Sequence, residues 1–204
     1  MASETGKLEM LEAKAPILFL LGGVLYGVGT VGLILTTYTG TSFGANTTIA
    51  ALGKVFVPLG LLGLYPALVE RRPYLSRAAA AVAVVPAACW SLAFVGGGIL
   101  EPAGIITDAP GLLALAPYVG FVGLYVTFAL FGVTVLLVDV HPRFLAALLL
   151  VYPAMAPLWM TVLSGVPDFV SSVFAVVIYA AVGVTLWKAD VSTGEADVPV
   201  EPTA

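Results

Sequence analysis

The chain has 204 residues, of which 60% are hydrophobic and only 10% are charged. A soluble domain carries about 25% charged residues, so this composition excludes an ordinary soluble protein and, outside the tails, intrinsic disorder. One cysteine and one histidine exclude a disulfide framework and the usual zinc sites. The composition therefore predicts an all-α integral membrane protein that needs no cofactor.

Six apolar stretches are long enough to cross the roughly 30 Å hydrocarbon layer of a bilayer as helices. They cover residues 16–36, 49–69, 78–98, 113–138, 144–163 and 169–187. Short runs rich in Gly, Pro, Ser and Asp separate them, as expected for turns between helices. The predicted organisation is an N-terminal tail at 1–14, a six-span membrane domain at 15–188 and a disordered acidic tail at 189–204.

The lysines and arginines predict how these spans are oriented. The side of the membrane that holds both termini carries seven of the eight cations, namely Lys7, Lys14, Arg71, Arg72, Arg77, Arg143 and Lys188. The opposite side carries none, and the eighth cation, Lys54, lies inside the second span. Because positive loops stay in the cytoplasm, both termini are predicted to be cytoplasmic and the protein to lie in the plasma membrane.

An internal repeat indicates a duplication. Residues 61–96 align without gaps with residues 130–165, and ten of the 36 positions are identical, including Gly63/Gly132, Pro73/Pro142 and Trp90/Trp159. The repeat unit is a two-helix hairpin, so spans 2–3 match spans 4–5 as a parallel repeat. A weaker match around residues 183–190 suggests that spans 6 and 1 form a third hairpin in a pseudo-threefold arrangement.

Lys54 is the most unusual residue, since a charge inside a span is costly. It lies five residues into its span, so its side chain either snorkels to the outer interface or lines a solute path. Candidate acidic partners on that side are Glu101, Asp108 and Asp168. Trp90 and Trp159, related by the repeat, complete the candidate path, with core packing as their alternative role.

Three acids, Glu70, Asp139 and Asp190, end the three spans that run toward the cytoplasm. They are predicted either to form a ring at the inner mouth of a path or to be interfacial carboxylates paired with nearby arginines. His141 lies beside Asp139 in a tight inner loop. Its imidazole is either a pH sensor or an ordinary solvated side chain.

Small residues and prolines predict how the helices pack. Gly23 and Gly27 form a small-x3-small motif, which favours close contact between helices of one chain or of two copies. The candidate packing glycines are Gly22, Gly23, Gly27, Gly63 and Gly132. Prolines inside the spans predict kinks, at Pro58, Pro66, Pro86, Pro117, Pro153 and Pro157.

The segment Ile106-Thr107-Asp108-Ala109-Pro110, followed by Gly120, Gly123, Leu124 and Tyr125, is similar to the small acetate/succinate uptake transporters. That family also has six spans in about 200 residues. The resemblance covers one loop and one span. The family's opening Asn-Pro-Ala-Pro-Leu-Gly motif is missing, because residues 14–18 read Lys-Ala-Pro-Ile-Leu.

The sequence contains no catalytic constellation and no basic nucleic-acid patch, and no Asp or Glu lies in the middle of a span. We therefore expect no enzyme and no nucleic-acid partner, but a small-solute channel or permease without a carboxylate proton relay. The alternative is a non-catalytic accessory subunit of a larger membrane complex, built as a solid bundle with an exposed small-residue face at 22–29. The expected partners are the bilayer and either a second copy or another membrane subunit. A lipid enzyme using Glu70, Arg71, Arg72, Asp139 and His141 is the least favoured alternative.

Overall fold

The computed structural model describes residues 2–40, 46–106, 111–161 and 165–196, which fold as helices joined by short turns. The helices are α1 (Ala2–Thr39), α2 (Asn46–Leu62), α3 (Tyr65–Val69), α4 (Pro73–Val95), the π-helical turn η1 (Gly96–Leu100), α5 (Gly111–Leu137), α6 (Arg143–Thr161) and α7 (Asp168–Ala196). The described residues contain no strand, which confirms the predicted all-α class.

Five helical segments among the described residues are long and apolar enough to cross a membrane. They are Met10–Thr39, Asn46–Val69, Pro73–Leu100, Leu113–Leu137 and Phe169–Ala189. The predicted span at 144–163 corresponds to α6, whose apolar part, Arg143–Trp159, is shorter. The structure is therefore consistent with a helical membrane protein, but it gives five such segments where the sequence predicts six.

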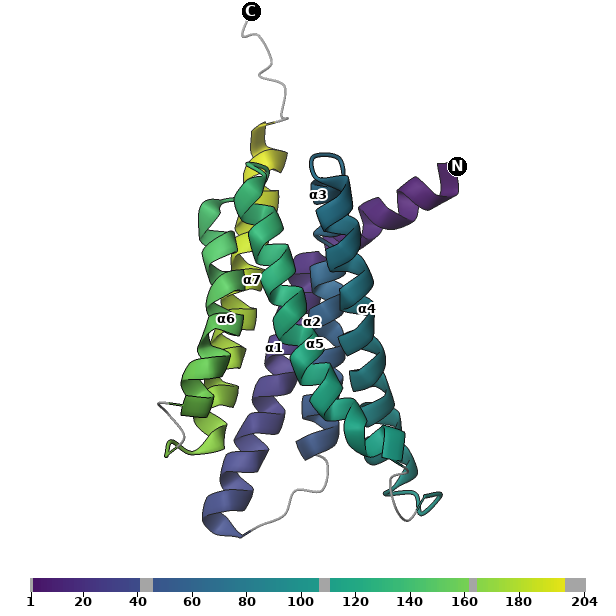
Figure 1. The fold of residues 1–204 in the computed structure, drawn as a ribbon, viewed down its shortest axis with the longest axis vertical. Coiled ribbons are helices and arrows are strands. Elements are labelled where there is room, and N and C mark those ends of the chain that lie inside the picture. Colours follow the sequence, from purple (N-terminus) through teal and green to yellow (C-terminus); the bar gives the residue numbers. More distant parts are fainter. Residues whose placement is uncertain (1, 41–45, 107–110, 162–164, 197–204) are drawn as a thin grey trace, which may run out of the picture.

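The contacts between the long helices form a closed ring in chain order. Each packs against its neighbours along the sequence, and α1 packs against α7 to close the ring. Consecutive helices run in opposite directions, so the two termini lie at the same end of the bundle (Figure 1). We call this the terminal end, and the other the distal end.

The two halves of the predicted repeat have different surroundings. A Cβ atom at Gly63 would meet Ala15 of α1, whereas one at Gly132 would meet Leu150 of α6, in its own hairpin. The chain around Gly63 is also broken between α2 and α3, whereas α5 is continuous through Gly132. The duplication thus remains a prediction from the sequence.

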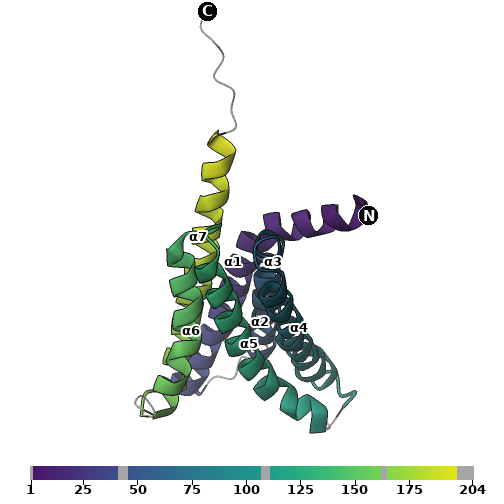
Figure 2. The same cartoon turned by 45° about the horizontal axis from the view of Figure 1, so that its top comes forward.

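Both ends of the chain are more helical than predicted. The expected N-terminal tail is helical from Ala2 onward, and its first turns point away from the bundle (Figure 2). The bend lies near Pro16. Proline has no backbone N–H to donate to the carbonyl four residues earlier, that of Glu12, and its ring crowds that carbonyl. At the other end, α7 continues to Ala196, which corrects the predicted disorder from 189 onward; residues 197–204 lie outside the described residues.

The predicted second span is divided into α2 and α3 by a proline. Pro66 has no N–H to donate to the carbonyl of Leu62, so the α-helical pattern stops there. The backbone tightens instead, with the N–H of Leu64 donating to the carbonyl of Leu61 at 3.0 Å. This break brings Gly63 and Leu64 to the terminal end of the bundle, beside α1.

Glycines hold α1 against α2 and α7. A Cβ atom at Gly22 would lie 2.9 Å from the carbonyl oxygen of Gly53, and one at Gly53 would lie 2.5 Å from the backbone nitrogen of Tyr26. Gly23 and Gly27 face α7, at Tyr179 and Val176. This glycine face therefore lies inside the protein. The prediction that it is exposed, made for an accessory subunit, is wrong.

The centre of the ring is filled by aromatic side chains, which we call the aromatic core: Phe19, Tyr26, Phe128, Tyr152 and Tyr179. The ring of Phe128 lies 4.7 Å from that of Tyr152 and 5.9 Å from that of Tyr179, measured between centroids. The hydroxyl of Tyr179 donates to that of Tyr152 at 2.9 Å, and the hydroxyl of Tyr26 donates to Ser172 Oγ at 3.0 Å. Large rings from α1, α5, α6 and α7 thus occupy the bundle axis.

Candidate functional site at Lys54

Lys54 extends into the bundle from α2 and is only 5% exposed. The preceding residue, Gly53, lets the backbone of α1 approach α2 at Tyr26. This contact places the Tyr26 ring over the lysine, with the ammonium Nζ 4.5 Å from the ring centroid. A buried side chain in this position excludes snorkelling to the interface, so that interpretation of Lys54 is wrong.

Three aromatic rings from three other helices surround the Lys54 ammonium, and we call them the aromatic cage. The centroids of Phe121 on α5, Trp90 on α4 and Tyr26 on α1 lie 3.7, 4.2 and 4.5 Å from Nζ. The Trp90 and Phe121 rings also meet edge to face, with centroids 4.9 Å apart. Each ring presents its negative face to the cation, an attraction worth about 0.5–2 kcal/mol.

Among the described residues, no ion pair or hydrogen bond involves the Lys54 side chain. Glu101, one of its candidate partners, is exposed. Asp108 and the side chain of Asp168 lie outside the described residues. A buried ammonium without a carboxylate is expensive in an apolar environment, and the ring faces offset only part of that cost.

Trp90 is the second predicted path residue that belongs to this site. It is buried against α5, where Gly120 leaves room for the indole: a Cβ atom at Gly120 would lie 2.9 Å from Trp90 Nε1. Within the described part of the chain, this buried N–H has no hydrogen-bond acceptor. Trp159 lies on α6, half-buried, and is not a member of the cage.

The three predicted inner-mouth acids lie near the terminal end. Glu70 is exposed where α3 ends, and Asp139 is exposed and pairs with Arg143, with a nitrogen-to-oxygen distance of 3.8 Å. The side chain of Asp190 lies outside the described residues. The pair between Asp139 and Arg143 is the arrangement expected of an interfacial carboxylate.

Sequence reasoning missed Tyr26 and Phe121 as members of the site. No sequence motif links either residue to Lys54, because both contact it from other helices. The one local signal is Gly53, a small residue directly before the charged one, which marks a close approach of another helix.

Comparisons with known proteins add no relative: no family model, curated protein or solved structure matches the chain. The similarity to the acetate/succinate transporters therefore rests on the quoted residues alone, and residues 107–110 of that segment lie outside the described residues.

Proposed function

We propose that this protein is a gated small-solute permease of the plasma membrane, with six spans and cytoplasmic termini. The span missing from the five long segments is α6, the fifth in chain order, whose 19 residues extend over about 28 Å, close to the thickness of the hydrocarbon layer. The position of α6 in the ring, between α5 and α7, supports this assignment. The distribution of lysines and arginines supports the orientation.

The observation that carries the proposal is the buried Lys54 in its aromatic cage. A methionine would fill the same space without the cost of a buried charge. An ammonium retained inside a membrane bundle therefore favours a role in binding a solute. Since no acid of the described residues neutralises it, the site favours small anions over cations.

The aromatic core supports gating rather than a permanently open channel, because large side chains occupy the axis. The helices of the cage contain weak points at which they can bend. Pro58 lies one turn after Lys54, Pro86 one turn before Trp90, and Pro117 one turn before Phe121. Each proline removes one backbone hydrogen bond beside the cage, so these segments are the expected hinges.

The test is solute flux into vesicles that contain the purified protein. Small carboxylates, chloride and small neutral solutes are offered to the wild type, to Lys54→Met and to Lys14→Met. Lys14 is exposed on α1 and is the matched control. We expect Lys54→Met to lower anion flux about tenfold or more, the loss of one charge-assisted contact, and Lys14→Met to leave it unchanged. Equal flux in all three proteins would contradict the proposal.

The filled aromatic core also favours the second candidate, an accessory subunit that stabilises a larger membrane complex. Its partner surface must differ from the glycine face of α1, which is covered by α2 and α7. This candidate predicts no flux above that of empty vesicles for the wild type with any offered solute. Measurable wild-type flux would exclude a purely structural role.

A further inference from the structure

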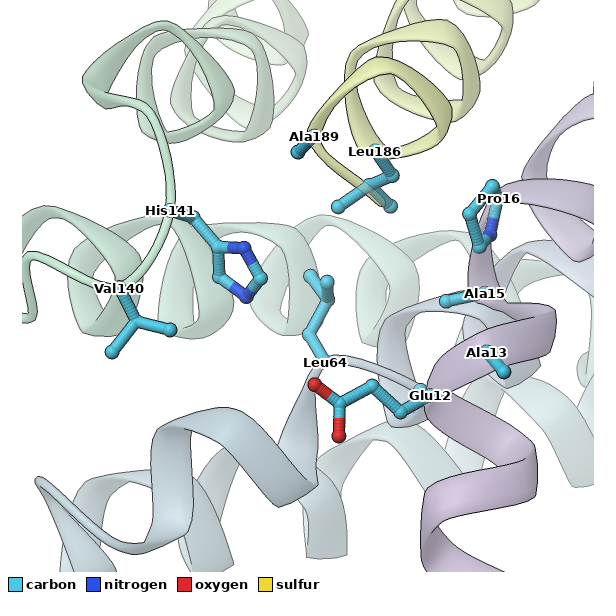
Figure 3. Close-up of a pocket in the computed structure, with 10 residues that line it drawn as sticks. Glu12, Ala13, Ala15, Pro16, Leu64, Val140, His141, Leu186 and Ala189 are labelled. Atoms are coloured by element: carbon cyan, nitrogen blue, oxygen red, sulfur yellow. The ribbon is translucent and has the colours of Figure 1, made fainter. Parts of the chain in front are cut away.

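A second feature, at the terminal end, is a cavity of about 390 Å³ beside the bend in α1 (Figure 3). Four parts of the chain meet there: α1 near Pro16, the break between α2 and α3, the loop between α5 and α6, and α7. The volume lies within the range of small-molecule sites in proteins. This cavity is separate from the Lys54 cage, since the two share no residue.

Most of the cavity wall is apolar. Small side chains from α1 leave the space open, and larger ones from other elements close it; the apolar wall residues are Ala13, Ala15, Pro16, Leu64, Val140, Leu186 and Ala189. An apolar wall of this kind stabilises a hydrocarbon group by removing it from water, by about 0.8 kcal/mol for each buried CH₂.

Two polar side chains face each other across Leu64, and they come from opposite sides of the cavity (Figure 3). Glu12 extends from α1, and the imidazole of His141 points inward from the loop after α5. His141 Nε2 is buried and has no hydrogen-bond partner in the described structure. Burial also lowers the pKa of His141, so the ring is neutral near pH 7 and one of its nitrogens accepts a hydrogen bond.

The charge of the lining selects the class of ligand. None of the ten described residues that line the cavity is a lysine or arginine, whereas Glu12 is a carboxylate. A carboxylate has about four acceptor sites, so Glu12 can accept from a ligand in addition to its contacts within the chain. A neutral imidazole nitrogen opposite it is a second acceptor. Both groups therefore suit a cation that carries several N–H donors.

We propose that this cavity binds an amphiphilic primary ammonium, with its N–H groups donating to Glu12 and His141 and its hydrocarbon chain along Leu64 and Leu186. Two sources share this chemistry, a free alkylamine and the headgroup of phosphatidylethanolamine. The proposal does not depend on the proposed permease function, because binding at this cavity requires no flux through the cage.

The only histidine of the chain provides the test. Isotope-labelled histidine gives one set of NMR signals in the detergent-solubilised protein, and n-hexylammonium is the probe. We expect hexylammonium to cause a saturable shift of the His141 signals. Hexanol has the same chain without the charge and should bind at least about tenfold more weakly. A shift that does not saturate, or equal binding of hexanol, would overturn the proposal.

Two variants locate the charge that binds the probe. Glu12→Gln keeps the shape of an exposed side chain and should weaken hexylammonium binding about tenfold or more. Glu70→Gln removes an exposed acid at the same end and should leave binding unchanged. Equal weakening by both variants would indicate general surface attraction and overturn the proposal.

The same signals, recorded in bilayer discs with and without phosphatidylethanolamine, separate the two sources. If the lipid alone shifts the His141 signals and prevents further change by hexylammonium, the bound group is a lipid headgroup. If hexylammonium acts equally in both discs, the ligand is a free amine. Both results support an ammonium site. The absence of any shift of the His141 signals with both the lipid and hexylammonium would overturn it.

Discussion

The ammonium of Lys54 lies 4.2 Å from the centroid of the Trp90 ring, and both residues are about 95% buried, being 5% exposed each. The contact joins α2 to α4, and the rings of Tyr26 and Phe121 extend it to α1 and α5. One charged side chain is thus in contact with three other helices of the ring. A change in the position of the Lys54 side chain would alter its contacts with all three of these helices at once. This arrangement suits the proposed gate.

Replacing Lys54 with methionine should leave the protein at least as stable as the wild type. The variant loses the ring contacts but also the cost of burying a charge, and methionine fills the same volume. Trp90→Ala should instead lower the free energy of unfolding by about 3–5 kcal/mol, because it leaves a large cavity. Thermal unfolding in detergent, followed by circular dichroism, measures both. A severe loss of stability in Lys54→Met would assign the lysine a structural role.

Gly53→Ala should destabilise the contact between α1 and α2. The added Cβ atom would lie 2.5 Å from the backbone nitrogen of Tyr26, and backbone cannot move aside as a flexible side chain does. We expect a loss of about 1–3 kcal/mol, typical of overpacking. Gly111→Ala is the control, since nothing lies within 4 Å of a Cβ atom there. Similar unfolding temperatures for the two variants would disprove the close approach.

The hydroxyl pair of Tyr152 and Tyr179 should be energetically coupled. Tyr179→Phe and Tyr152→Phe each remove one partner of a buried hydrogen bond and should each cost about 1 kcal/mol. The double variant should cost clearly less than the sum of the two. Tyr118→Phe, at an exposed position, should be neutral. Fully additive losses, measured by denaturant unfolding, would show that the two hydroxyls do not interact.

His141 should make the protein less stable in mild acid. Burial lowers the pKa of His141 in the folded state, so the unfolded chain binds a proton more readily. Stability is therefore full above the unfolded pKa of about 6.5 and falls below it, by no more than about 1.4 kcal/mol per pH unit.

The histidine effect is isolated by comparing the wild type with His141→Asn at pH 7.5 and 5.5. Glu12 faces the imidazole across the cavity, and the exposed Asp139 and Arg143 flank it in the loop. These groups remain in both proteins, so their own titration largely cancels. An identical pH dependence of the two melting temperatures would show that His141 does not contribute.

The helices were largely predictable because their apolar length is a local property of the chain. The direction of Lys54 was not, since it depends on rings that other helices supply. A lysine five residues into a span can reach either the interface or the interior, and only the approach of Tyr26 at Gly53 decides between them. The cavity at His141 could not be predicted for the same reason, because its walls come from four separate segments.

Access of water-soluble reagents to position 54 tests the permease account most directly. The lone cysteine is first removed as Cys89→Ala, and Lys54→Cys is then exposed to charged thiol reagents from each side of sealed vesicles. Val57→Cys, buried on the same helix, controls for a loosened fold. The account predicts labelling of position 54 from both sides and no labelling of position 57. A cysteine at 54 that reacts from neither side would contradict permeation through the cage and favour the accessory subunit.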